Sequence, residues 1–187
     1  MRKIIQSINI TPDGFCDHTA VIADDELHEF YNEMVKQMDT MIFGRVTYDL
    51  MKNAWPTIAK ERTAPKAMVE FADLIDNINK IVFSRTLKKS DWNNTTIIPE
   101  INRDEILRLK EGEGKDILVG GINVMDQFSQ MGLIDEYYFQ VHPIIEGKGV
   151  RFFNTLELSK RINLNLIDIK TFKSGVVSLK YIVKRDE

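Results

Sequence analysis

Apolar residues recur along the chain at two spacings that alternate from segment to segment. Between Ile4 and Ile10, apolar and polar residues alternate as in a β-strand, and Pro12-Asp13-Gly14 then supplies turn residues. From about Asp25, the apolar residues follow at three- and four-residue steps through Met38, which predicts an amphipathic helix. The apolar run 41–43 predicts a short buried strand that ends at a glycine, and a helix start follows it.

The same alternation continues to the end of the chain. Further strands are predicted at 80–84, 95–98, 116–119 and 137–145, with a terminal hairpin at 162–172 and 176–183. Helices are predicted from Pro65 to Ile75, from Asn102 to Gly112, and after Gly120-Gly121 to about Met131. Strands that alternate with helices favour an α/β fold with a mostly parallel sheet, to which the hairpin adds antiparallel strands.

Length and composition narrow the class further. The chain has 187 residues, of which 43% are hydrophobic, so we expect a single domain over residues 1–187 with one continuous core. Its 25 basic and 28 acidic residues nearly balance without a basic block, which argues against nucleic acid as a partner. The start, Met1 to Ile5, is too short for a signal peptide and no apolar run approaches ~20 residues, so we expect a cytoplasmic protein without a membrane partner.

Three predicted strand ends share a composition that suits phosphate groups. They are Phe43-Gly44-Arg45-Val46-Thr47, Phe83-Ser84-Arg85-Thr86 and Val119-Gly120-Gly121-Ile122-Asn123. In a parallel sheet the carboxyl ends of the strands lie on one edge, where ligands usually bind. Glycines let a pyrophosphate approach the main chain, helix N-termini offer free N–H groups, and arginines grip phosphate. We therefore expect a valine at Gly121 to block a dinucleotide while leaving the fold intact.

Each of these features alone is also typical of a tight turn or a solvated loop. The chain has neither G-x-G-x-x-G nor the G-x-x-x-x-G-K-[ST] loop, so the sequence does not indicate a Rossmann or nucleoside-triphosphatase cradle. The stretch Cys16-Asp17-His18 has atoms that bind metals, but no second cluster completes a site, and we expect a polar loop without metal.

Several segments together resemble the dihydrofolate reductase superfamily. The segments 39–49, 81–85 and 117–124 look like its cofactor-binding segments in the same order, and the block 132–153 is similar to the riboflavin-biosynthesis reductase branch. The resemblance implies a three-layer α/β/α fold around a mixed, mainly parallel sheet of about eight strands, with a C-terminal antiparallel hairpin. It also implies NADPH as cofactor and a homodimer in which residues 147–153 lie at the subunit contact.

Carried over position by position, the resemblance assigns the cofactor site. Residues Gly44, Arg45, Val46 and Thr47 would hold the phosphates, and Ser84 and Arg85 would meet the 2′-phosphate of NADPH. The segment Gly120, Gly121, Ile122, Asn123 and Val124 would line the pyrophosphate and the approach to the nicotinamide.

The substrate side is assigned less directly. Dihydrofolate reductases place one carboxylate on the first helix, and here an ungapped count from Gly44 reaches His28, whereas a small shift selects Asp25 or Glu26. Asp13 matches an aspartate that shapes the substrate pocket in the riboflavin branch. We therefore take Asp13, Asp25 and Glu26 as the catalytic candidates, although acids at a helix start also occur for purely structural reasons.

The sequence leaves the substrate open between two heterocycles. The lysine that the riboflavin branch has on its first strand is Ser7 here, and the segment at Gly44 follows the Gly-Arg-x-Thr-Tyr form. We expect an NADPH-dependent reductase that passes hydride to a small nitrogen heterocycle, either dihydrofolate- or pterin-like or of the 5-amino-6-ribosylaminouracil type. The alternative is a non-catalytic dinucleotide-binding or interaction protein of the same fold.

Overall fold

The most buried strand explains the layered architecture. Strand β2 (Met38–Gly44) sends Met41 and Phe43 into the core on one face of the sheet and Ile42 into the core on the other. Successive side chains of a strand point to opposite faces, so a continuous apolar run needs a cover on both. β2 accordingly lies inside the sheet, parallel to β3 (Asn79–Phe83) on one side and β5 (Asp116–Val119) on the other.

The sheet has eight strands in the order β4-β3-β2-β5-β1-β6-β8-β7 in the computed structural model, which describes residues 1–18, 21–22 and 24–185. The other five strands are β1 (Ile4–Ile10), β4 (Thr95–Ile98), β6 (Glu136–Val141), β7 (Leu164–Thr171) and β8 (Val177–Val183). The strands from β4 to β6 in this order run parallel, and β8 and β7 add an antiparallel hairpin at one edge. This mixed sheet confirms the predicted fold class.

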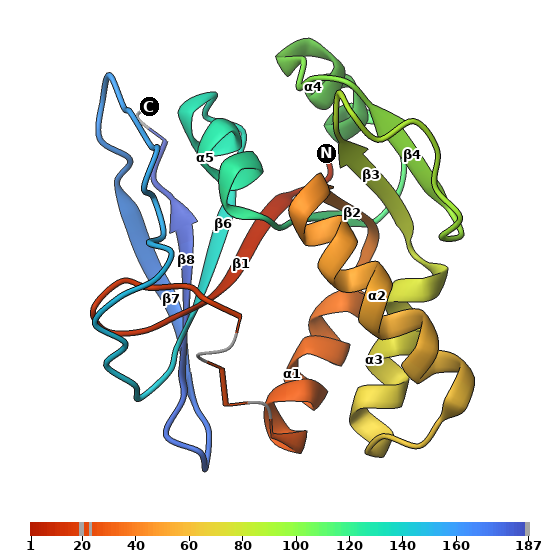
Figure 1. The fold of residues 1–187 in the computed structure, drawn as a ribbon. Coiled ribbons are helices and arrows are strands. Elements are labelled where there is room, and N and C mark those ends of the chain that lie inside the picture. Colours follow the sequence, from red (N-terminus) through yellow and green to blue (C-terminus); the bar gives the residue numbers. More distant parts are fainter. Residues whose placement is uncertain (19–20, 23, 186–187) are drawn as a thin grey trace.

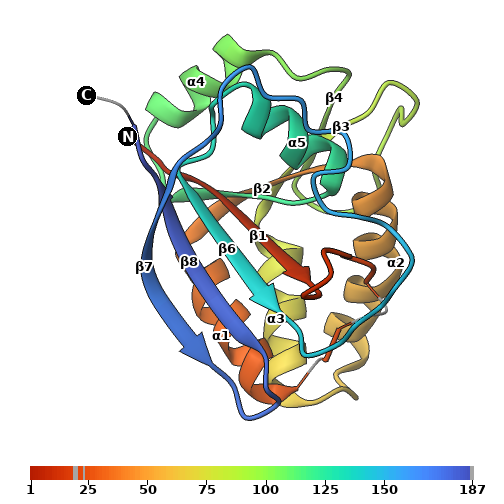
Figure 2. The same cartoon turned by 90° about the vertical axis from the view of Figure 1, so that its left-hand side faces the viewer.

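Helices cover both faces of the sheet. They are α1 (Asp25–Lys36), α2 (Arg45–Glu61), α3 (Lys66–Asn77), α4 (Arg103–Glu111) and α5 (Ile122–Gln130). Figure 1 shows α1, α2 and α3 grouped on one side of the sheet and α4 and α5 on the other, and Figure 2 shows the same layers from a second direction. Each described helix is too short or too polar to cross a membrane.

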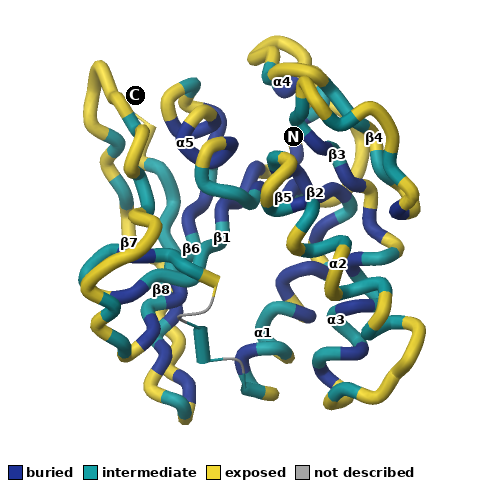
Figure 3. The backbone as a smooth tube through the Cα atoms, in the orientation of Figure 1, coloured by how far each residue is buried: buried dark blue, intermediate teal, exposed yellow. Residues whose placement is uncertain are grey.

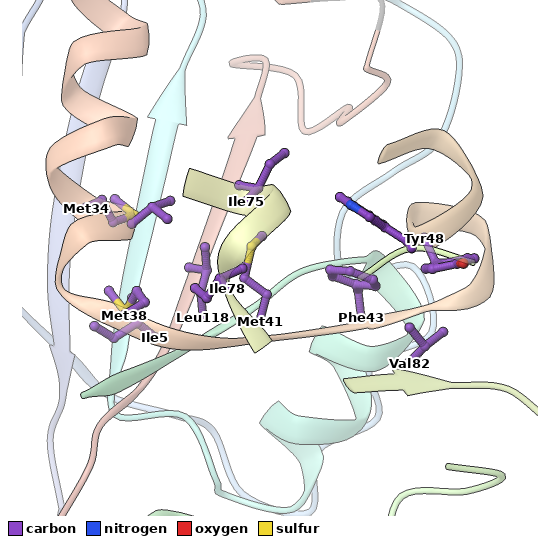
Figure 4. Close-up of a cluster of buried hydrophobic side chains, with 12 residues drawn as sticks. Ile5, Met34, Met38, Met41, Phe43, Tyr48, Ile75, Ile78, Val82 and Leu118 are labelled. Carbon is purple, nitrogen blue, oxygen red and sulfur yellow. The ribbon is translucent and has the colours of Figure 1, made fainter. Parts of the chain in front are cut away.

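Each face of the sheet has its own apolar core. On the face of α1, α2 and α3, methionines and aromatic residues fill the space around β2, as Figure 4 shows for Met34, Met41, Phe43 and Tyr48. On the other face, Phe128 of α5 packs with aliphatic side chains of the inner strands. Figure 3 shows that burial is greatest in these inner strands and lowest along β7.

The predicted elements are all present, and the errors lie at their ends. Met38 begins β2 instead of ending α1, and α2 continues through Pro56 to Glu61, where Arg62 adopts a left-handed conformation. The strand predicted at 137–145 was wrong at its end, because β6 stops at Val141. The next N–H, that of His142, still bonds the Ile10 carbonyl at 2.8 Å, but Pro143 then has no N–H to continue the ladder.

Candidate functional site

The three predicted phosphate segments lie side by side at the carboxyl edge of the sheet. In the register of the strands, Gly44 is opposite Phe83 and Ile42 is opposite Val119. The turn at Ser84 therefore lies beside the start of α2, and the Gly120 N–H bonds the Ile42 carbonyl at 2.8 Å. Three segments that are far apart in the sequence thus form one rim.

The two adjacent glycines of this rim have different structural reasons. Gly121 has a φ of +83°, and a Cβ there would lie 2.7 Å from the Thr47 Oγ1 atom and 3.5 Å from the Gly44 nitrogen. A Cβ on Gly120 would meet nothing within 4 Å among the described residues. Gly121 therefore serves the packing of α5 against α2, which corrects the expectation that a valine there leaves the fold intact. Gly120 leaves the open space that a phosphate needs.

The helices α2 and α5 begin at the rim without side-chain caps. Their N-cap residues are Gly44 and Gly121, and neither helix has an acidic residue in its first turn. A Cβ on Gly44 would lie 3.3 Å from the Val124 side chain, so the two helix starts approach closely. Val46, in the first turn of α2, is 75% exposed. Two positive helix ends consequently face solvent at one place, which is the electrostatic condition for binding a phosphate pair.

The two arginines of the rim differ in how firmly they are held. The Arg45 Nη1 atom donates to the Thr86 hydroxyl at 2.8 Å, and its Nε atom pairs with Asp49 at 3.3 Å. Arg45 thereby joins α2 to the turn after β3. The Arg85 side chain is 77% exposed. Within the described chain, its one ion pair is with the exposed carboxylate of Glu100, at 3.3 Å. Such a solvated pair is weak, so Arg85 can turn to another anion at little cost.

Ser84 shapes the turn that carries Arg85. Its hydroxyl oxygen accepts from the Leu87 N–H at 3.0 Å and from the Thr86 N–H at 3.3 Å. The remaining residues predicted for the cofactor, Ile122 and Asn123, occupy the first turn of α5. The structure therefore brings all the predicted cofactor residues to the same rim.

Two of the three predicted catalytic acids, Asp13 and Glu26, have hydrogen-bond partners outside the cofactor segments. The Asp13 carboxylate accepts from the Thr11 hydroxyl at 2.6 Å and from the Gly147 N–H at 2.8 Å, and these bonds lower its pKa. Asp13 therefore stays ionised and ties the turn after β1 to the loop after β6. Glu26 accepts from the Lys173 N–H at 3.1 Å in the β7–β8 turn, and Asp25 is exposed beside it.

The start of α1 shows why these acids are there. Asp24 caps the helix by accepting from the Leu27 N–H at 2.7 Å, and this bond is the main cause of its lowered pKa. Asp25 and Glu26 follow in the first turn, where negative charge is favourable. The ring of His28 bonds the Asp24 carbonyl at 2.9 Å through Nδ1.

A polar cluster at the ends of β1 and β6 was missed by the sequence analysis. The Asn9 Oδ1 atom lies 2.6 Å from the Tyr31 hydroxyl and 2.7 Å from the His142 Nε2 atom. Asn9 is half-buried and His142 fully buried. The sequence offered no clear signal, because Asn9 is one of three polar residues in the alternating pattern of β1.

Two cavities lie away from the rim. One of about 420 Å³ lies between α2, α3 and the segment before β4, and its lining includes Lys52, Asp76 and Trp92. The other, of about 300 Å³, lies near the amino ends of β1 and β6 and is lined by Phe30 and Tyr138 among others. Neither lining contains a residue of the rim.

The layered sheet, the hairpin at its edge and the paired helix starts define a dihydrofolate reductase-like α/β protein. The chain belongs to the RibD C-terminal domain family, whose model matches residues 2–178. The family match and the fold shared with dihydrofolate reductase are consistent with an oxidoreductase. The chain is 32% identical to the protein YyaP of Bacillus subtilis strain 168 over 186 residues, which is 96% of this chain and 94% of YyaP.

Two solved structures show the same fold. A protein from Shewanella sp. PV-4 that is assigned to riboflavin biosynthesis superposes with a TM-score of 0.72 at 19% identity, over 98% of this chain and 99% of that one. Dihydrofolate reductase from Enterococcus faecalis, solved with NADP(H), superposes with a TM-score of 0.62 at 12% identity, over 98% and 97% of the two chains.

Proposed function

We propose that this protein is an NADPH-dependent reductase that passes hydride to a small nitrogen heterocycle. The heterocycle is dihydrofolate- or pterin-like, or of the 5-amino-6-ribosylaminouracil type. The observation that supports the cofactor is the meeting of two uncapped helix starts at the rim, beside two arginines. The residues present suit a dinucleotide, because Gly120 leaves space exactly where two positive helix ends converge.

The chain itself would bind and orient this cofactor. The N–H groups of Gly44 to Thr47 and of Gly121 to Asn123 would hold the pyrophosphate, and Arg45 and Arg85 would hold the 2′-phosphate. NADPH, when bound, supplies the hydride, and the protein supplies placement and the exclusion of water.

The source of the proton is a narrower question. Asp13 is a poor donor, because hydrogen bonds keep its pKa low and its carboxylate charged. We therefore assign Asp13 to shaping the loops around the substrate and retain Asp25 and Glu26 as the acidic candidates. Glu26 is engaged by the Lys173 N–H, and the alternative, a dinucleotide-binding protein without turnover, needs no proton donor.

One experiment separates the enzyme from this alternative. NADPH is titrated into the protein while its melting temperature is followed, and the loss of nicotinamide absorbance is then measured with dihydrofolate and with 5-amino-6-ribosylaminouracil. The enzyme shows both a thermal shift and turnover with one of the two. A shift without turnover on either substrate supports the binding protein, and the absence of any shift overturns both.

We also propose that two copies of the chain pair through β7. This strand is the edge of the sheet and has seven exposed residues, among them Leu166, Ile167 and Ile169, which is 54% exposed. Long apolar edge strands rarely stay uncovered in soluble proteins. An antiparallel pairing centred on Ile169 would place Asp168 of each copy opposite Lys170 of the other, so charge complementarity favours a second copy as the occupant.

The molecular mass in solution tests this pairing. Sedimentation of the wild type is expected to give twice the chain mass of 21.7 kDa, and Ile169→Lys is expected to give the monomer. Val150→Lys, at another exposed aliphatic residue, probes the contact that the resemblance places at residues 147–153. A dimer that survives Ile169→Lys but dissociates in Val150→Lys would contradict the β7 contact in favour of that loop.

A further inference from the structure

The hydrogen bonds around Asn9 fix which way its amide group points. The Ile22 N–H donates to the His142 Nδ1 atom at 3.1 Å, so this nitrogen accepts. Burial lowers the pKa of His142 and keeps the ring neutral, which leaves the ring proton on Nε2. The Nε2–H group therefore donates to Asn9 at 2.7 Å. Its acceptor must be the carbonyl oxygen of the amide.

Tyr31 reinforces the same orientation. Burial raises the pKa of Tyr31, so its hydroxyl keeps its proton and donates to the Asn9 Oδ1 atom at 2.6 Å. Two donors thus converge on one oxygen, and a rotated amide would turn an N–H₂ group toward both of them. The Asn9 Oδ1 and Nδ2 atoms are consequently not interchangeable.

The register of the strands shows where Asn9 lies relative to the rim. Asn9 pairs with Gln140 of β6, whereas β5 ends at Val119, opposite Gln6. β1 therefore extends four residues beyond β5, to Ile10. Figure 2 shows the end of β1 beside the end of β6. The Oδ1 atom bonds Tyr31 of α1 and His142 after β6, which leaves the other branch of the planar amide without a described partner. Asn9 pairs with β6 but lies beyond the end of β5, where the chain turns at Gly120-Gly121.

The Nδ2 atom is available for a ligand within the described chain. Asn9 is half-buried, and none of the described residues accepts a hydrogen bond from its Nδ2 atom. The orientation of the Asn9 amide is fixed by residues of two separate elements, Tyr31 of α1 and His142 after β6. An oriented donor without an acceptor is a costly arrangement unless a ligand supplies the acceptor.

We propose that Asn9 is a specificity residue, whose Nδ2 atom donates to a carbonyl oxygen of the heterocycle. This inference rests on the proposed function and narrows its substrate class to heterocycles with an oxo group at the position that faces β1. An exocyclic amino group at that position would place its N–H donors against the Asn9 Nδ2 donor, so the site would reject such a heterocycle.

The variant Asn9→Asp tests this role without removing the support. A carboxylate still accepts from Tyr31 and from His142, but its second oxygen presents an acceptor in place of the donor. The probes are a pterin with a 4-oxo group and the matched 2,4-diaminopteridine, each titrated calorimetrically in a mildly alkaline buffer with NADPH saturating. We expect the wild type to prefer the 4-oxo compound by at least about tenfold, and Asn9→Asp to reverse the preference.

Tyr31→Phe is the matched control. It removes one bond to the Oδ1 atom and leaves the outward donor, so it should lower the melting temperature and keep the preference for the 4-oxo compound. An unchanged preference in Asn9→Asp, or no binding of either pteridine to the NADPH-bound wild type, would overturn the role of Asn9. Failure of NADPH itself to bind would instead overturn the proposed function, and it is measured separately.

Discussion

The carboxyl edge of the sheet has two halves that are built in different ways. The half between β3, β2 and β5 is made mainly of main chain, with Gly44 and Gly121 at the starts of two helices. The half at β1 and β6 is made of side chains from three separate segments, in which Asn9 lies 22 positions from Tyr31 and 133 from His142. The first half can bind a phosphate group, which many proteins bind in this way. The second half can distinguish one substrate from another.

The helix starts show the same difference. α1 and α4 are capped by Asp24 and Asn102, and each has acidic residues in its first turn. α2 and α5 have neither feature, and both begin at the rim. A side-chain cap satisfies free N–H groups, whereas an uncapped start at the rim leaves N–H groups for an anion. α3 also lacks a side-chain cap and an acidic first turn, so α2 and α5 are distinguished by their position at the rim together with the missing caps.

Gly120→Val is expected to have the largest effect on this comparison. A Cβ there meets no described atom within 4 Å, so the melting temperature without ligand should change little. The same side chain would fill the space for the pyrophosphate and weaken NADPH by at least about 100-fold, or roughly 3 kcal/mol. Titration calorimetry with NADPH measures it. Unchanged affinity would show that no phosphate approaches Gly120.

Gly121→Ala should show the opposite behaviour, a loss of stability before any loss of binding. The positive φ and the 2.7 Å approach of Thr47 Oγ1 to the added Cβ should lower the free energy of unfolding by about 2 kcal/mol. Urea denaturation measures the change.

Thr47→Ala in the same chain serves as the control for Gly121→Ala. It removes the crowded hydroxyl and should restore part of the lost stability, because the strain of the positive φ remains. A Gly121→Ala protein as stable as the wild type would mean that both glycines serve only the ligand.

Arg85→Ala should reduce the preference for NADPH over NADH, and this effect should be smaller than those of the two glycine variants. The loss of one charge-assisted bond to the 2′-phosphate predicts about tenfold weaker NADPH, or roughly 1.4 kcal/mol, with NADH unaffected. Glu100→Ala is the matched control, because it releases Arg85 from its partner and should slightly strengthen NADPH. Equal losses for both cofactors would remove Arg85 from the 2′-phosphate site.

The fold could be predicted well from the sequence because the residues of each strand indicate by themselves which side chains are buried. Alternation in β1, the continuous run in β2 and the turn residues of the hairpin each identify an element without reference to the rest of the chain. The errors came where tertiary contacts decide an end, as at Val141, where pairing with β1 stops at a proline.

The rim could be predicted for the same reason, because a strand, a glycine and a helix start are adjacent in sequence. The Asn9 cluster could not, because its members meet only when β1, α1 and β6 are assembled. For the acids of α1 the sequence leaves the role open, because a capped helix start and a catalytic carboxylate have the same local composition. Asp24 and Glu26 are already engaged by the Leu27 and Lys173 N–H groups.

The smallest expected effect concerns the protonation of His142. Burial lowers its folded pKa below the ordinary value of 6.5, although Asp24 partly opposes this. The unfolded chain therefore takes up this proton first as the pH falls, so the stability that the neutral ring contributes is present above about pH 6.5 and is lost below it. Asp13 and Asp24, with pKa values lowered from 3.8, lose their contributions only in more acidic solution, which keeps the two windows apart.

The variant His142→Gln isolates this effect, because glutamine offers an acceptor and a donor but does not titrate. The wild type should lose more of its free energy of unfolding than the variant between neutral and mildly acidic pH, as measured by urea denaturation at a series of pH values. Parallel curves would mean that folding does not change the pKa of His142 and would contradict the effect of burial. If the variant lost more stability than the wild type, the folded ring would hold its proton more tightly; a charged ring could not accept from Ile22, and the fixed orientation of Asn9 would lose its support.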